Sequence, residues 1–327
     1  MSDNNFNYLH KPMMVYSEGK FDPFVTRLSE WIKQEIEPTV HYDMALIGVP
    51  LSRSSITLSN AFAHPQQFRQ LWSNFTTYNF EEDIDLVNMK VTDLGDVKMH
   101  VTDVLQCHNN IEEAAYEVSG KLPHTLPVHI GGDHSITYPI IKGMKRSKNN
   151  RIGLIQFDAH LDVRDVEYGG PSNGTPIRSL MEKDIVQGED IVTIGLRSFA
   201  NSKIYRDYAE EKGMTLFTAK QVREQGMEEV IKWSMDYLNE KCDQVYVTFD
   251  IDVMDQSYVP AVPAIGPDGL TSRDIFYSAL TLGQWDKVAG IDLVCVDPSR
   301  DVRDVTSRVA LHIFLHFASG RRMLLGE

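Results

Sequence analysis

Three short segments concentrate acidic and imidazole side chains directly after apolar, β-branched runs. They read Gly-Gly-Asp-His-Ser at 131–135, Asp-Ala-His-Leu-Asp at 158–162 and Asp-Ile-Asp at 250–252. If each run is a strand of one parallel sheet, the segments meet at one edge. So much negative charge repels itself unless cations neutralise it, and two divalent ions would also activate water. The pattern therefore indicates a metal-dependent hydrolase. The candidate ligands are His134, Asp158, His160, Asp162, Asp250 and Asp252.

Each segment alone is a weak indicator. A polar loop facing solvent explains 158–162 equally well, and Asp-x-Asp pairs such as 250–252 are common. The combination is more specific, because His134 adds a nitrogen ligand behind two glycines that permit a tight turn. An oxygen-rich set with two imidazoles suits Mn²⁺ better than Zn²⁺, while Mg²⁺ and Fe²⁺ stay open as alternatives.

Composition narrows the class of protein. The chain has 327 residues and a net charge of -14, which disfavours nonspecific binding to nucleic acid or anionic membranes. Its three cysteines, Cys107, Cys242 and Cys295, are widely spaced, which argues against a disulfide framework and suits a reducing cytoplasm. Residues 1–20 lack the apolar core of a signal peptide, and no apolar run is long enough to span a bilayer. We expect a cytoplasmic protein that acts on a small molecule.

Strand-like and helical segments alternate along the chain. The expected strands are 44–49, 126–130, 152–157, 191–196, 214–217, 245–249 and 288–296. The expected helices are 24–36, 103–118, 136–146, 202–212, 227–240, 272–282 and 306–318. This alternation predicts a mostly parallel sheet with helices on both faces. Without a linker or a repeat, 1–327 reads as a single catalytic domain with 1–40 as a peripheral N-terminal segment. The Gly- and Pro-rich connections 164–176 and 254–271 are expected to bind substrate.

The three acidic segments, in this order, resemble those of the ureohydrolases, a family that includes arginases, agmatinases and formimidoylglutamases. The resemblance runs from about residue 46 to about residue 317. It implies a three-layer α/β/α sandwich, two Mn²⁺ ions per chain and a homo-oligomer. It also implies that Asp162 passes a proton to the leaving nitrogen. By the same match, one ion is held by His134, Asp158, Asp162 and Asp250, and the other by His160, Asp158, Asp250 and Asp252.

The loop after the second segment separates the classes within this family. Residues 169–178 lack the histidine that arginases and agmatinases carry there, and they resemble formimidoylglutamases instead. That resemblance implies hydrolysis of N-formimidoyl-L-glutamate to L-glutamate and formamide, in histidine degradation; a guanidino hydrolase is the alternative. Because this substrate carries two carboxylates, Arg164 and Arg178 are candidate contacts and Arg197 is a weaker one. Asn173 is a candidate hydrogen-bond partner. The alternatives are structural ion pairs for the arginines and a turn for Asn173.

One residue departs from the family pattern. Segment 294–298 reads Val-Cys-Val-Asp-Pro, whereas the family usually has glutamate in the second position to contact the cationic substrate head. With Cys295 in place of this glutamate, three alternatives are open. The substrate differs from that of the family, Asp297 makes the contact to the substrate head instead, or the chain is a metal-binding relative with little activity. A buried structural cysteine is the remaining alternative. If Cys295 is a substrate contact, Cys295→Glu is expected to raise a low activity.

Three further histidines are expected to be structural. His64 is expected at the surface or at a helix cap. His312 and His316 share a helical face, but Ile313 stands where a zinc protease motif needs glutamate.

Overall fold

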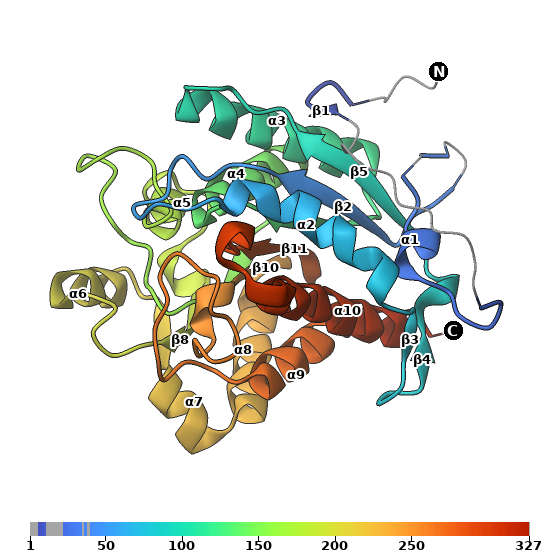
Figure 1. Ribbon diagram of the computed structural model, residues 1–327. Helices are drawn as coiled ribbons and strands as arrows, with labels where there is room; N and C mark the ends of the chain where they lie inside the picture. Colours follow the sequence, from blue (N-terminus) through green and yellow to red (C-terminus); the bar gives the residue numbers. More distant parts are fainter. Residues whose placement is uncertain (1–5, 11–21, 35, 38–39, 327) are drawn as a thin grey trace.

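The computed structural model describes residues 6–10, 22–34, 36–37 and 40–326. Its centre is a nine-stranded sheet in the order β1-β5-β2-β6-β11-β10-β7-β8-β9 (Figure 1). The strands are β1 Leu9–His10, β2 Met44–Val49, β5 Val91–Val97, β6 Leu126–Gly131, β7 Ile152–Phe157, β8 Ile191–Leu196, β9 Thr215–Thr218, β10 Gln244–Asp250 and β11 Val288–Val294. Only β1 runs antiparallel to its neighbour in this sheet, while β3 Tyr78–Asn79 and β4 Ile84–Asp85 form a separate antiparallel pair.

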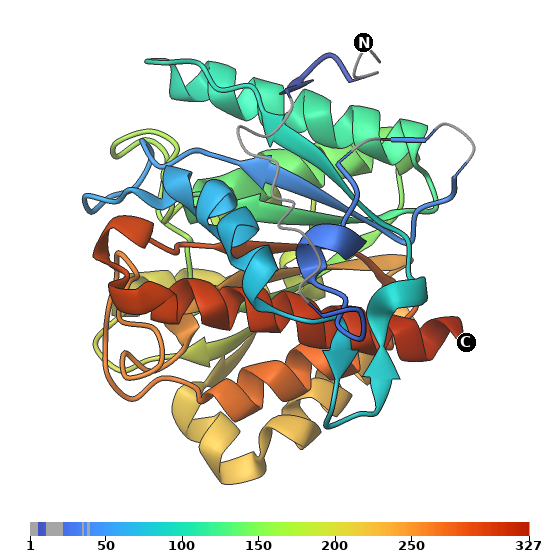
Figure 2. The same ribbon diagram turned by 45° about the vertical axis from the view of Figure 1, so that its right-hand side comes forward.

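Helices cover both faces of the sheet. They are α1 Leu28–Trp31, α2 His64–Gln70, α3 Val104–Lys121, α4 Thr137–Lys148, α5 Pro176–Glu182, α6 Lys203–Glu211, α7 Ala219–Gln225, α8 Met227–Lys241, α9 Ser272–Gly283 and α10 Val305–Leu325. One apolar cluster contains residues of α3 to α6, and a second contains residues of α1, α2 and α7 to α10. Figure 2 shows α10 in red and α3 in teal on opposite sides of the sheet. The three-layer α/β/α prediction is confirmed.

The continuous apolar runs follow from this double coverage. On β2, Met44 and Leu46 face one cluster while Ala45 and Ile47 face the other, since alternate side chains of a strand point to opposite faces. The described part of the chain contains no helix that is long and apolar enough to cross a membrane.

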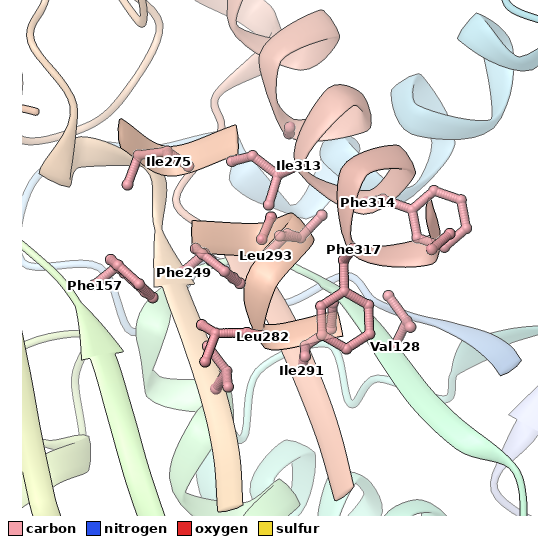
Figure 3. Packing of buried hydrophobic residues seen from close by; sticks show 14 of the residues in the cluster. Val128, Phe157, Phe249, Ile275, Leu282, Ile291, Leu293, Ile313, Phe314 and Phe317 are labelled. Carbon is pink, nitrogen blue, oxygen red and sulfur yellow. The ribbon is translucent and has the colours of Figure 1, made fainter. Parts of the chain in front are cut away.

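A stacked aromatic pair fixes the strand ends from which the acidic segments start. Phe157 on β7 and Phe249 on β10 are paired in register, and their rings stack with centroids 4.7 Å apart (Figure 3). The residue after each phenylalanine is an aspartate, Asp158 or Asp250. Packing of the two rings therefore sets these two carboxylates side by side.

The helix expected over 24–36 is much shorter in the structure, so that prediction was wrong. Among the described residues of this range, only Leu28–Trp31 is helical, because the backbone of Lys33 pairs with β5 instead. The Lys33 amide donates to the Val91 carbonyl, and the Asp93 amide donates to the Lys33 carbonyl. Within the expected peripheral segment 1–40, β1 extends the sheet, and Leu28 and Trp31 belong to the apolar core.

Strand β5 was not predicted, because two acidic residues interrupt its apolar pattern. Asp93 and Asp96 are buried there and form ion pairs with Arg69 of α2 at 2.8 and 2.7 Å. The cation that makes a buried acidic strand tolerable comes from a segment more than 20 residues earlier. The strand expected over 288–296 ends at Val294, since Cys295 has the left-handed φ of 68°.

The placement of His64 was also predicted wrongly. This residue begins α2 but is fully buried, with its Nδ1 3.1 Å from the carbonyl oxygen of Gly131. His312 and His316 pack against the ring of Phe276, at centroid distances of 5.6 and 4.6 Å. Their packing fits the expected structural role.

Candidate metal centre and substrate pocket

All six candidate ligands converge at the carboxyl ends of β6, β7 and β10. His134, Asp158 and Asp250 bring one ligand atom each within 4.8 Å of one another, and we call these three residues the first ligand group. Asp158, His160 and Asp252 do the same and form the second ligand group. Asp158 belongs to both groups, so its carboxylate is placed where two ions could share it. The structure shows Asp250 in the first group only.

Carboxylate oxygens surround one nitrogen of each imidazole. His134 Nδ1 lies 2.8 Å from Asp162 Oδ2, 3.1 Å from Asp158 Oδ2 and 3.3 Å from Asp250 Oδ2. His160 Nδ1 lies 3.2 Å from Asp252 Oδ2 and 3.3 Å from Asp158 Oδ1. Asp162 thus joins the first ligand group through His134.

The ligands perturb one another strongly. Burial, reinforced by the charge of Asp158, raises the pKa of Asp162 to about 6. Burial, reinforced by Asp252 and Asp158, raises the pKa of Asp250 to about 7. The negative charge of Asp252 is the largest cause that raises the pKa of His160 to about 12. Protons thus partly neutralise the cluster when no cation does so, and a divalent ion would displace them.

The atoms of the first ligand group fit a cation. His134 Nδ1 is buried and has no hydrogen-bond partner of acceptable geometry, while Nε2 of the same ring lies 2.9 Å from Thr248 Oγ1. The unpartnered nitrogen points into an oxygen cluster, as a metal-ligating imidazole does. Carboxylate oxygens with two imidazole nitrogens suit Mn²⁺.

Asn201 holds the second acidic segment in shape, and sequence reasoning gave it no role. Its Oδ1 accepts a hydrogen bond from the Leu161 amide at 2.8 Å, and its Nδ2 donates to the Ala159 carbonyl at 3.0 Å. Asp162, at the end of this segment, has a left-handed φ of 52°, which turns the chain back toward His134. Asn201 lies outside the three acidic segments, so their spacing gave no signal for it.

A pocket of about 290 Å³ opens over the ligands. His160, Asp162, Asp250 and Asp252 line it together with Arg164, Asn173 and Tyr205. The Arg164 guanidinium lies 6.0 Å from the centroid of the Tyr205 ring and has no acidic partner among the residues that the structure describes. Asn173 ties two loops together: its Oδ1 accepts from the Ile56 amide at 2.8 Å, and its own amide donates to the Ser54 carbonyl at 3.0 Å.

The other two candidate arginines are engaged elsewhere. Arg178 forms ion pairs with Asp165 at 2.6 Å and with Glu182 at 2.7 Å, and it does not line the pocket. This placement favours its alternative role as a structural ion pair. Arg197 donates to the Gly266 carbonyl at 2.7 Å, which anchors the connection 254–271.

Cys295 lies beside the metal ligands but outside the pocket lining. Its side chain is buried, and its pKa is raised well above the ordinary value by burial and then by the charges of Asp250 and Asp252. This placement favours a buried structural cysteine over a substrate contact. Asp297, its suggested substitute, is also buried and accepts hydrogen bonds from the Asn60 amide and the Ser299 hydroxyl.

Comparisons with known proteins agree with this geometry. A family model described as the arginase family matches residues 42–319. A formimidoylglutamase from Halalkalibacterium halodurans is 44% identical over 276 residues, covering 84% of this chain and 86% of the relative. The crystal structure of formimidoylglutamase from Bacillus subtilis superposes with a TM-score of 0.90 at 38% identity, covering 94% of this chain and 95% of that one. A Trypanosoma cruzi formiminoglutamase with Mn²⁺ has the same fold, with a TM-score of 0.83 at 23% identity over 91% of this chain and 98% of its own.

Proposed function

The chain belongs to the arginase family, and we propose that it hydrolyses N-formimidoyl-L-glutamate to L-glutamate and formamide, a reaction of histidine degradation. One observation carries the choice of substrate: Arg164, a cation without an acidic partner among the described residues, lines the same pocket as the candidate ligands Asp162, Asp250 and Asp252. A substrate with two carboxylates and an amidine head matches a pocket with a cation at one side and carboxylates at the other.

The metal cofactor is proposed to be two Mn²⁺ ions per chain. His134, Asp158, Asp162 and Asp250 would hold one ion, and Asp158, His160, Asp250 and Asp252 the other. Such a pair would lower the pKa of a bound water and so supply a hydroxide nucleophile near neutral pH. The Mn²⁺ named for the T. cruzi structure supports this choice of metal.

The side chains around the pocket have distinct proposed roles. Arg164 binds a substrate carboxylate, and Asn173, while tying the loops, offers its side-chain Nδ2 as a hydrogen-bond donor. Asp162 is proposed to pass a proton to the leaving nitrogen, because its carboxylate lines the pocket. The volume of about 290 Å³ suits a small amino-acid derivative.

A guanidino hydrolase is the rival activity within the same family. Agmatine carries a cationic tail, which Arg164 would repel, and the connection 164–176 contains no histidine. A silent metal-binding relative was the other alternative, and it depended on Cys295 as a missing substrate contact. The burial of Cys295 outside the pocket removes the main argument for that alternative.

Turnover of a substrate panel tests the proposal. The protein, reconstituted with Mn²⁺, is assayed with N-formimidoyl-L-glutamate, agmatine, L-arginine and 4-guanidinobutyrate. We expect the first to have by far the highest kcat/KM, and Asp250→Asn to remove turnover and weaken Mn²⁺ binding. Asp236→Asn, which changes an exposed aspartate on α8, is the matched control and should behave like the parent. Agmatine turnover that equals or exceeds that of formimidoylglutamate would overturn the substrate assignment.

We also propose that the protein is cytoplasmic and assembles as a homo-oligomer. The three cysteines are buried and unpaired, as thiols are in a reducing compartment. Leu58 and Val101 are exposed apolar residues that line one surface hollow, which suits contact with a second copy. Sedimentation velocity across a concentration series tests the assembly, and a monomer throughout would contradict it.

A further inference from the structure

Five buried polar side chains form one row across the middle of the sheet. In strand order they are His129 on β6, Asp292 on β11, Thr248 on β10, Gln156 on β7 and Thr193 on β8. Each is paired in register with the next, and none is more than 3% exposed. Side chains two residues apart on a strand share a face. Asp250 is two residues after Thr248, and Asp158 is two residues after Gln156. The two aspartates therefore lie on the same face of the sheet as the polar row, in the next row toward the carboxyl ends of the strands.

The core does not need this polar row. A polar group costs free energy when it is buried unless hydrogen bonds compensate, so an apolar row would be the simpler solution. Leu154 and Ile191, two residues before Gln156 and Thr193, are apolar and belong to the core cluster on that face. On β7 and β8 the polarity thus begins only in the layer next to the ligands, and the hydrogen bonds of Gln156 and of Thr248 lead to the ligands.

One chain of hydrogen bonds ends on His134. Thr248 Oγ1 donates to Asp292 Oδ1 at 2.5 Å, and Thr137 Oγ1, at the start of α4, donates to Asp292 Oδ2 at 2.7 Å. Because the only hydroxyl proton of Thr248 is engaged by Asp292, Thr248 Oγ1 accepts from His134 Nε2–H at 2.9 Å. A bound cation would displace any proton from Nδ1, so the proton of the imidazole would then be on Nε2 and the lone pair of Nδ1 would face the ion among the carboxylates.

A second chain ends on Asp158. Thr193 Oγ1 donates to Gln156 Oε1 at 2.8 Å, which fixes the orientation of the amide. Gln156 Nε2 then donates to Asp158 Oδ2, also at 2.8 Å. Asp158 is the residue shared by the two ligand groups. The amide thus holds the shared carboxylate in one rotamer.

We propose that this polar row positions the metal ligands, with Thr248 and Asp292 setting the tautomer of His134 and Gln156 orienting Asp158. The proposal rests on the proposed metal pair, and it assigns a role to three residues outside the pocket lining, Thr248, Asp292 and Gln156. Groups that hydrogen-bond the far nitrogen of a ligating histidine typically contribute about 10- to 100-fold in metal affinity.

The two chains predict different metal-binding defects. Thr248→Val keeps the shape of the side chain but removes the hydroxyl, so it should weaken only the ion that His134 holds. Gln156→Leu removes the contact to the shared Asp158 and should weaken both ions. Each affected site should lose about 10- to 100-fold in Mn²⁺ affinity. Thr248→Ser, which keeps the hydroxyl, should restore affinity to within a few-fold of the parent.

Titration of the metal-free, full-length protein with Mn²⁺, followed by calorimetry and by electron paramagnetic resonance of free Mn²⁺, tests the inference. The matched control is Thr92→Val on β5, because Thr92 is equally buried in the same sheet but its hydroxyl donates to the Lys33 carbonyl, away from the ligands. Thermal unfolding without metal reports any purely structural damage. We expect Thr248→Val and Thr92→Val to be similar in that measurement and to differ in Mn²⁺ affinity.

Unchanged Mn²⁺ affinity in both Thr248→Val and Gln156→Leu would overturn the inference, as would equal losses in Thr92→Val. If Thr248→Val does not fold, Asp292→Asn is used in its place. An Mn²⁺ affinity of Asp292→Asn equal to that of the parent would then overturn the inference in the same way. The titration needs no substrate. A wrong substrate assignment would therefore leave its result intact, whereas a parent protein without Mn²⁺ binding would defeat both proposals.

Discussion

Arg164 begins the connection 164–176 and Arg178 lies in α5 directly after it, yet the two arginines have different surroundings. Arg164 faces the pocket without an acidic partner in the described structure, whereas Arg178 is held between Asp165 and Glu182. A cation that is already paired gains little from a second carboxylate, so only the first is suited to bind substrate.

We expect Arg164→Leu to raise the KM for formimidoylglutamate by about 10-fold or more, because a hydrogen bond to a charged group contributes about 1.5–3 kcal/mol. The kcat should fall less, since the proposed contact of Arg164 is with the end of the substrate away from the reacting carbon. Steady-state kinetics of the Mn²⁺-loaded protein measure both. Arg178→Leu is the comparison: it should leave KM near the parent value and lower thermal stability instead. If Arg178→Leu raised KM and Arg164→Leu lowered only thermal stability, Arg178 would be the substrate contact and Arg164 the structural residue.

Cys295 shows how burial changes the expected effect of a substitution. The residue is 2% exposed, has a left-handed backbone and borders two ligand carboxylates. Cys295→Glu inserts a larger, charged group there, so we now expect it to destabilise the protein by about 1–3 kcal/mol rather than to raise activity. Denaturant unfolding of the metal-free protein measures this loss. Cys295→Ser, which is close in size, should be milder, and a faster, equally stable Cys295→Glu variant would restore the role as a substrate contact.

At the scale of elements, strand β5 depends on a cation from α2. Arg69 is buried between Asp93 and Asp96, and the expected strands from pattern alone did not include β5. Arg69→Met should lower the free energy of unfolding by about 3–5 kcal/mol, because it leaves two buried carboxylates without their cation. Chemical denaturation measures the loss.

The control for that substitution is Arg206→Met on α6. Arg206 pairs with Glu210 at 2.8 Å, but both side chains are exposed, and such surface pairs contribute little to stability. Similar losses in the two variants would mean that the ion pairs of β5 do not stabilise the sheet.

At the scale of the whole molecule, three buried histidines make stability depend on pH. Burial lowers the pKa of His64, His108 and His129 to about 4, from an ordinary value of 6.5. The unfolded chain therefore binds more protons between these two values, so stability falls as the pH falls through this window. Each histidine should account for about 2 kcal/mol between pH 7 and pH 5.

His64→Asn tests this dependence for one site. The asparagine amide can still donate toward the Gly131 carbonyl but does not titrate in this range, so the loss of stability between pH 7 and pH 5 should shrink by about 2 kcal/mol. Unfolding of metal-free protein at both pH values measures the change. His124→Asn, which changes an exposed histidine, should leave the dependence as it is. An unaltered dependence in His64→Asn would show that the pKa of this histidine is the same in the folded and in the unfolded chain, so that its burial does not lower it.

The sequence by itself determined the layered fold and the six candidate ligands, because both depend on short-range patterns. Continuous apolar runs predict covered strands, and each ligand follows such a run within a few residues. The carboxyl ends of neighbouring parallel strands share one edge, so ligands in separate segments had to meet there. The structure brings them together as expected.

Only the tertiary structure showed which polar residues lie at the candidate site and which are engaged elsewhere in the fold. Arg164 and Arg178 have the same side chain, and Gln156 and Thr248 read as ordinary interruptions of apolar strands. Their roles depend on partners that folding brings from distant segments, such as Asp292 beside Thr248, 44 residues away. The energy of a buried charge or hydroxyl is set by what surrounds it, and those surroundings exist only once the strands have paired.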